Sequence, residues 1–291
     1  MGLPRQSLAA RCLAELVGTF ILVFFGCGAV HAAVLANVQH DLWQVAIVWG
    51  IGVMLASYVV GGISGAFINP AITIAMAAWR RFPWSDVPGY ILAQLGGAIL
   101  AALVLLLLFS PFLRDLEDRK KVVRGEAGSE ITAMCYGEYF PSPGSLAGGD
   151  EPYSIEKHDK INAQVPEPIA CIAEILGTAL LALVVFAITD DRNAAAPQAR
   201  LAPAFIGLTI AVLISVIAPL TQACFNPARD FGPRLVAYFA GWGRIALPRG
   251  LGFLTVYILS PIAGAVAGGG LYLGVLRPAQ PAPAPERSDA S

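Results

Sequence analysis

Five polar side chains stand in stretches of sequence that are otherwise apolar: Glu15, Asn69, Glu174, Asn226 and Arg229. Ionisable residues inside a membrane segment are costly, and by default they mark a functional site. Paired carboxylates can relay protons or bind a coupling ion, whereas amide and guanidinium groups donate hydrogen bonds to neutral solutes. The residue types therefore indicate a transport path, if the elements that carry them cross a bilayer.

The composition indicates a membrane protein, because 56% of the residues are hydrophobic and only 13% are charged. The net charge of −1 comes without a basic patch, which argues against a nucleic-acid partner. The cysteines lack CxxC spacing and the histidines form no metal-ligand pattern, so no cofactor is expected. Six apolar segments are long enough to span a bilayer, namely 13–36, 42–61, 88–110, 168–189, 201–218 and 251–276.

The two halves of the chain share an internal repeat. Three segments recur in the same order, AELVGT at 14–19 as AEILGT at 173–178, FINPA at 67–71 as CFNPA at 224–228, and YIL at 90–92 as YIL at 257–259. The repeat also favours a true first span over the alternative of a signal peptide. Each copy has three spans, so the second copy is inverted in the membrane.

The run 42–79 contains no charged residue, and a straight helix of that length would reach about 57 Å, almost twice the hydrocarbon core. The chain must therefore break inside the run. Asn is a favoured N-cap and Pro suits the first turn, so Asn69-Pro70 and Asn226-Pro227 each predict a helix start. Two half-helices that meet at these N-termini would together fill the core.

Paired Asn-Pro-Ala motifs in half-helices, within an inverted repeat whose halves open with Ala-Glu-x-x-Gly-Thr, resemble the aquaporin (major intrinsic protein) family, glycerol-facilitator branch. The resemblance implies an all-α membrane protein with six transmembrane helices and two re-entrant half-helices. The expected organisation is a cytoplasmic N-terminus 1–12, a first repeat 13–110 with half-helix 69–79, a long extracellular loop 111–167, a second repeat 168–276 with half-helix 226–238, and a disordered cytoplasmic tail 277–291. Within the long loop, residues 142–166 form a polar insertion that is expected to be a disordered excursion, with a functional lid as the alternative.

The resemblance also implies a set of site residues. It places Asn69 and Asn226 at the pore centre, Trp49, Ile214, Ala223 and Arg229 at a constriction, Glu15, Glu174, Pro70, Ala71, Pro227 and Ala228 in support of the re-entrant loops, and Asp230 and Arg234 in a branch signature. In the family, the aromatic face at the constriction packs on the carbon side of a polyol, and polar donors opposite bind its hydroxyls. Ile214 and Ala223 depart from the Gly and Phe of typical glycerol facilitators, and the absence of His at the first of these positions argues against a strict water filter.

The function that the resemblance implies is passive conduction of glycerol and related small neutral solutes, with some water, and exclusion of ions and protons. It also implies a homotetramer in the cell membrane, with both termini cytoplasmic. A mainly water-conducting channel is the nearest alternative. A coupled secondary transporter that uses Glu15 and Glu174 is the alternative from another class, and no catalytic constellation indicates an enzyme.

Overall fold

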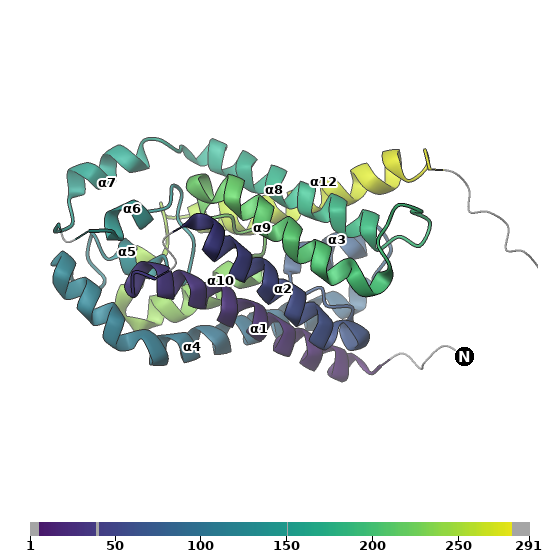
Figure 1. The fold of residues 1–291 in the computed structure, drawn as a ribbon, viewed down its shortest axis with the longest axis horizontal. Coiled ribbons are helices and arrows are strands. Elements are labelled where there is room, and N and C mark those ends of the chain that lie inside the picture. The colour runs from purple at the N-terminus through teal and green to yellow at the C-terminus, as the bar shows by residue number, and fades with distance from the viewer. Residues whose placement is uncertain (1–5, 39–40, 150, 281–291) are drawn as a thin grey trace, which may run out of the picture.

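The computed structural model describes residues 6–38, 41–149 and 151–280. Six helical segments in it are long and apolar enough to cross a membrane, and they lie roughly side by side (Figure 1). They are α1 (Leu8–Leu35), α2 (Leu42–Ser64), α4 (Val87–Lys120), α8 (Glu167–Ile188), α9 (Ala202–Thr221) and the segment Gly252–Leu276, which contains α12 (Ser260–Leu271). The predicted all-α membrane fold is confirmed.

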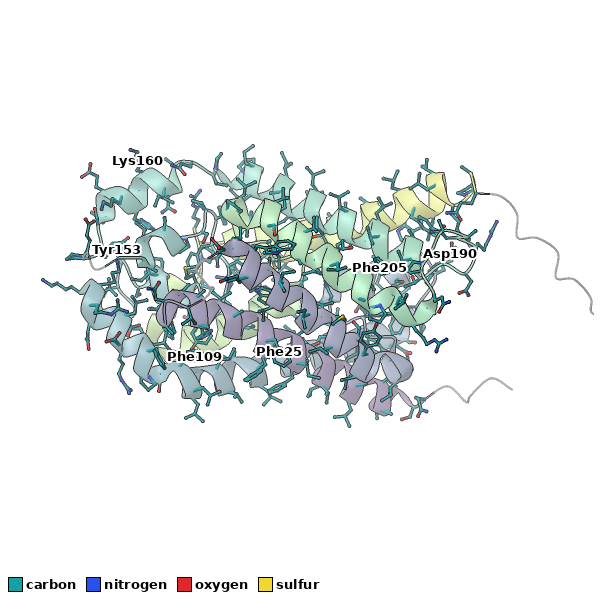
Figure 2. All side chains as sticks on the ribbon, in the orientation of Figure 1. Phe25, Phe109, Tyr153, Lys160, Asp190 and Phe205 are labelled. Atoms are coloured by element: carbon teal, nitrogen blue, oxygen red, sulfur yellow. The ribbon has the colours of Figure 1, made fainter. Side chains whose placement is uncertain are left out.

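The bundle has two distinct ends. The terminus face is the end at which the first and last described residues, Gln6 and Gln280, both lie, and the loop face is the opposite end (Figure 1). The loop face carries three short helices, α5 (Glu130–Ala133), α6 (Gly144–Ala147) and α7 (Ile155–Asn162). Figure 2 shows Tyr153 at the loop face and Asp190 at the terminus face. Most of the predicted tail, residues 281–291, lies outside the described residues.

The prediction that residues 142–166 lack regular structure is wrong, because α6 and α7 form there. The Ser154 hydroxyl caps α7 by accepting the Lys157 N–H at 3.3 Å. Arg249 then holds the end of this segment by donating to the carbonyl oxygens of Asn162 at 2.5 Å and Val165 at 3.2 Å. These contacts join the loop to a distant part of the chain.

The third span is longer than its apolar run, which ends near residue 110, because α4 continues as far as Lys120. Leu113 and Leu116 on this extension are buried against the segments of the loop face. After α4 the chain turns at residues 121–129, and α5 follows this turn.

Two half-helices begin inside the bundle and run to opposite faces. They are α3 (Pro70–Ala78) and α10 (Pro227–Ala237), whose bounds agree with the predicted 69–79 and 226–238 within one residue at each end. Figure 1 shows α3 among the helices near the terminus face and α10 nearer the loop face. Non-helical backbone at this depth is tolerated only where protein or a watery cavity surrounds it.

The internal repeat is visible in matched backbone contacts. A Cβ built on Gly97 would lie 2.1 Å from the Leu16 carbonyl oxygen, and one built on Gly264 would lie 2.4 Å from the Ile175 carbonyl oxygen. These two pairs occupy equivalent positions in the two halves, so α4 packs on α1 as α12 packs on α8. Small residues permit this close approach, which gives membrane helices their packing energy.

The same contacts predict a destabilising substitution. Gly264→Val is expected to lower the free energy of unfolding by about 1–3 kcal/mol, because the added side chain would overlap the α8 backbone. Gly274→Val is the matched control, since a Cβ built there meets no atom of another packed segment within 4 Å. The check is the thermal unfolding midpoint of each purified variant in detergent, and equal midpoints would contradict the packing argument.

Candidate functional site

Each half-helix begins at an asparagine that caps it. The Asn69 side-chain oxygen accepts the Ala71 N–H at 2.8 Å, and Pro70 occupies the first turn of α3. The Asn226 side-chain oxygen accepts the Ala228 N–H at 3.1 Å in the same way. Both helices thus direct the positive ends of their dipoles toward the middle of the bundle.

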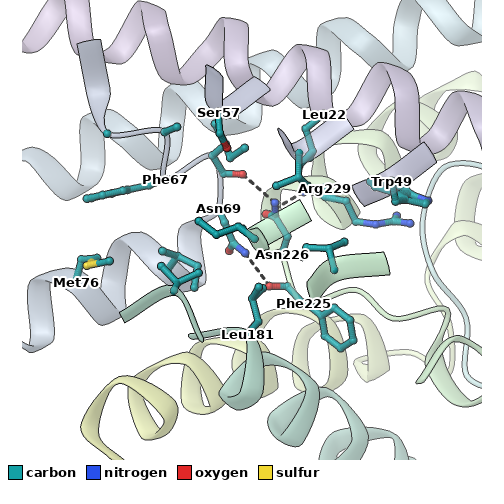
Figure 3. A pocket seen from close by; sticks show the side chains of 18 of the residues that line it. Leu22, Trp49, Ser57, Phe67, Asn69, Met76, Leu181, Phe225, Asn226 and Arg229 are labelled. Carbon is teal, nitrogen blue, oxygen red and sulfur yellow. Dashed lines mark hydrogen bonds between the residues drawn. The ribbon is translucent and has the colours of Figure 1, made fainter. Parts of the chain in front are cut away.

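The two caps also brace one another (Figure 3). The Asn69 amide nitrogen donates to the Phe225 carbonyl oxygen at 2.8 Å, and the Asn226 amide nitrogen donates to the Ile68 carbonyl oxygen, also at 2.8 Å. Each side-chain amide has two N–H groups. Each brace uses one of them, so one N–H of each asparagine is left for another acceptor.

Glu15 supports the loop before α3. Its carboxylate accepts hydrogen bonds from the Ser64 hydroxyl at 2.6 Å, the Phe67 N–H at 3.0 Å, the Ile68 N–H at 2.6 Å and the Gln94 amide at 2.7 Å. Ile68 has a φ of 42°, which is a strained value for a β-branched residue. The carboxylate therefore holds a backbone turn that this sequence would not adopt unaided.

Glu174 supports the second loop in the equivalent way. Its carboxylate accepts from the Thr221 hydroxyl at 2.6 Å and from the N–H groups of Cys224 and Phe225, each at 2.9 Å. Phe225 has a φ of 52°, so this turn is strained as well. Both glutamates are completely buried, and their bonds all run to the re-entrant loops or to neighbouring helices.

A cavity of about 320 Å³ passes the two asparagines, and we call it the inner cavity. Its wall includes Arg81, which lies beside Asp190 at the terminus face, together with Gly65 and Thr189. It also includes Trp49 and Arg229, which Figure 3 shows beyond the two asparagines. The outer cavity, of about 240 Å³, opens toward the loop face. The residues that line both cavities are Trp49, Ile214 and Arg229.

Three of the four predicted constriction residues therefore stand where the two cavities meet. Ala223 lines the inner cavity only. The Arg229 guanidinium lies 4.2 Å from the centre of the Trp49 ring. The ring and the guanidinium are therefore in direct contact with each other.

The structure adds a residue that the sequence analysis missed. Arg229 forms an ion pair with Glu138, whose side chain is 0% exposed and comes from the segment between α5 and α6. The signal in the sequence is weak, a single carboxylate in the otherwise apolar run MCYGEYFP at 134–141. A buried guanidinium needs such a partner, because an uncompensated charge is costly away from water.

Asp230 and Arg234 fix the position of Glu138. The Asp230 carboxylate accepts the Glu138 N–H at 2.8 Å, and Arg234 donates to the Glu138 carbonyl oxygen at 2.7 Å. Arg234 also donates to Asp230 at 2.9 Å within α10. The two residues of the predicted branch signature, Asp230 and Arg234, thus connect the segment that carries Glu138 to α10 by hydrogen bonds.

In the described part of the chain, no group of three or more His, Cys, Asp or Glu side chains could hold a metal ion. The chemistry available at the cavity junction is hydrogen bonding by Arg229, next to apolar contact with Trp49 and Ile214.

Six spans, two half-helices that meet at their capped N-termini, and a cavity that passes those caps define an aquaporin-like membrane protein. The chain belongs to the major intrinsic protein family, whose family model matches residues 3–272.

Proteins similar in sequence to this chain include uptake facilitators. The chain is similar to the glycerol uptake facilitator protein of Pseudomonas aeruginosa, with 39% identity over 99% of this chain and 98% of the relative. It is also similar to the propanediol uptake facilitator PduF of Citrobacter freundii, with 37% identity over 92% of each chain. Among solved structures, the aquaglyceroporin from Plasmodium falciparum matches with a TM-score of 0.77 and 22% identity over 94% of this chain and 98% of that one, which supports the fold.

Proposed function

We propose that the protein is a passive channel for glycerol and related small neutral solutes, with some water. The observation that carries the proposal is the pair of cavities that meet at Trp49, Ile214 and Arg229, because this junction offers both a polar donor and apolar surface. A polyol has hydroxyls along one side and carbon along the other. Its hydroxyls would bind the Arg229 guanidinium while its carbon side contacts Trp49 and Ile214.

Asn69 and Asn226 serve as the second binding point, at the centre of the path. Their remaining amide N–H groups donate to the solute oxygen, and the two helix N-termini place positive potential there. A cation or proton at this point meets that potential, so we propose that the centre disfavours positive charge while it admits neutral solutes.

We also propose the orientation of the protein in the membrane and its assembly. We place the terminus face in the cytoplasm of a cell-membrane protein because of its arginines. Arg81, Arg192 and Arg277 contact Asp190 on that face, Arg80 precedes Arg81, and Arg11 lies in the first turn of α1. A homotetramer with one pore per subunit is the assembly that the family resemblance implies.

Stopped-flow light scattering of proteoliposomes in an inward glycerol gradient tests the proposal. We expect rapid shrinkage followed by protein-dependent reswelling, unchanged by a pH gradient and altered in Arg229→Ala and Trp49→Ala, since both side chains form the cavity junction. Protein-free vesicles and a mannitol gradient are the controls.

Shrinkage without reswelling would favour the mainly water-conducting channel, in which Ile214 closes the junction to glycerol. Reswelling that depends on a pH or sodium gradient would favour the coupled transporter. Unaltered kinetics in both variants would move the solute path away from this junction.

A further inference from the structure

A second guanidinium lines the inner cavity at the end opposite Arg229. Arg81 follows α3, and the αL conformation of Arg80, with a φ of 57°, lets the Arg81 N–H return to the Met76 carbonyl oxygen at 2.8 Å. This turn sets the Arg81 side chain on the cavity wall at the terminus face, and Thr189 lines the same cavity. The guanidinium is also 5.7 Å from the centre of the Phe186 ring.

Asp190 holds this guanidinium from behind the wall. Its carboxylate lies 3.6 Å from Arg81, yet Asp190 is not among the described residues that line the cavity. The carboxylate is itself fixed, since it accepts from Arg277 at 2.6 Å, from the Tyr272 hydroxyl at 3.1 Å and from the Arg192 N–H at 3.2 Å. Asp190 is 5% exposed and therefore a rigid, partly desolvated anchor.

The anchor carries a negative charge. Burial acts to raise the pKa of Asp190, but the Arg192 N–H, Arg277 and Tyr272 lower it, and the resulting pKa is below the ordinary value for an aspartate. The carboxylate is therefore ionised at neutral pH and attracts both guanidinium groups that face it.

We infer that Asp190 is a positioning residue for permeation, because it ties the Arg81 guanidinium to the wall and so keeps the terminus-face end of the inner cavity open. This inference rests on the proposed channel function. Arg229 is held by Glu138 in a similar way at the other end, so each arginine of the path is drawn toward a buried carboxylate. An arginine side chain without such a partner has several rotatable bonds and can enter the passage beside it.

The test uses the full-length protein in proteoliposomes and measures glycerol reswelling per reconstituted copy. Asp190→Asn is expected to lower glycerol permeability about threefold, because a partly exposed ion pair contributes a free energy that corresponds to a change of about this size. Asp190→Asn combined with Arg81→Gln is expected to restore the wild-type rate, since no guanidinium is then left to obstruct the path. The exposed neighbour Asp191→Asn is the matched control and should leave the rate unchanged.

Failure of rescue in the double variant would overturn the inference, because Asp190 would then act by anchoring Arg277 or the loop. A reduced rate in Arg81→Gln alone would also overturn the inference, because Arg81 would then assist permeation. If Asp190→Asn fails to fold, the rate of Arg81→Gln alone tests the inference. A wild-type protein that conducts no glycerol would instead refute the proposed function, so the two failures are distinguishable.

Discussion

Glu138→Ala is expected to lower glycerol permeability by at least about tenfold, because removing one partner of a buried ion pair costs about 3–5 kcal/mol. Arg229 would keep its charge without a carboxylate beside it. The guanidinium would then leave the Trp49 ring for water in the outer cavity, and the donor geometry at the cavity junction would be lost. Stopped-flow reswelling in glycerol measures the change.

Two variants separate this effect from general damage to the loop face. Glu130→Ala removes a carboxylate from α5 on the same loop face, where it accepts the Gly128 N–H, and it should retain most of the wild-type rate. Glu138→Gln keeps an acceptor oxygen without the charge, so its rate should fall between those of Glu138→Ala and the wild type. If Glu138→Ala conducts glycerol as the wild type does, the ion pair does not position Arg229 for permeation.

The half-helices could be predicted from sequence because their signals are local. An Asn-Pro pair specifies both a cap and a first turn, and a charge-free run longer than a bilayer requires a break near it. The inverted repeat then placed the second half-helix by comparison with the first. Hydrogen bonds of Asn69 and Asn226 across the centre follow from that arrangement.

Glu138 was not predictable in this way, because its position depends on contacts between distant segments. The chain must leave α4 near Lys120, return through α5, and be tied to α10 by Asp230 and Arg234. No spacing in the sequence encodes that path. The short helix α7 was missed for a related reason, since only eight residues form it and Arg249 holds its end.

The cavity junction shows the same limit. The family resemblance places Trp49 and Arg229 at a constriction but does not give the contact between the guanidinium and the ring, which are 4.2 Å apart. The reason is three-dimensional. A Cβ on Gly26 would lie 2.1 Å from the Trp49 ring, so the ring is held close against α1, and Glu138 holds the guanidinium near it.

Glu174→Gln is expected to reduce the free energy of unfolding by about 3 kcal/mol and to abolish most glycerol conduction. A glutamine has one acceptor oxygen and an NH₂ group in place of the second oxygen. That NH₂ group would face the N–H of Cys224 or Phe225, so one backbone donor of the re-entrant loop would lose its acceptor. The loop would relax, and with it the cap at Asn226 and the position of Arg229. Thermal unfolding in detergent and glycerol reswelling measure the two effects.

Glu167→Gln is the matched control on α8, because its carboxylate accepts from the Thr255 hydroxyl near the loop face and supports no re-entrant loop. Its unfolding midpoint and its rate should stay close to those of the wild type. The pair of variants also separates the two uses of an intramembrane glutamate. A structural Glu174 predicts lost stability and a residual flux indifferent to a pH gradient. A coupling Glu174 predicts unchanged stability in Glu174→Gln and loss of a gradient dependence that the wild type possesses, which would favour the transporter over the channel.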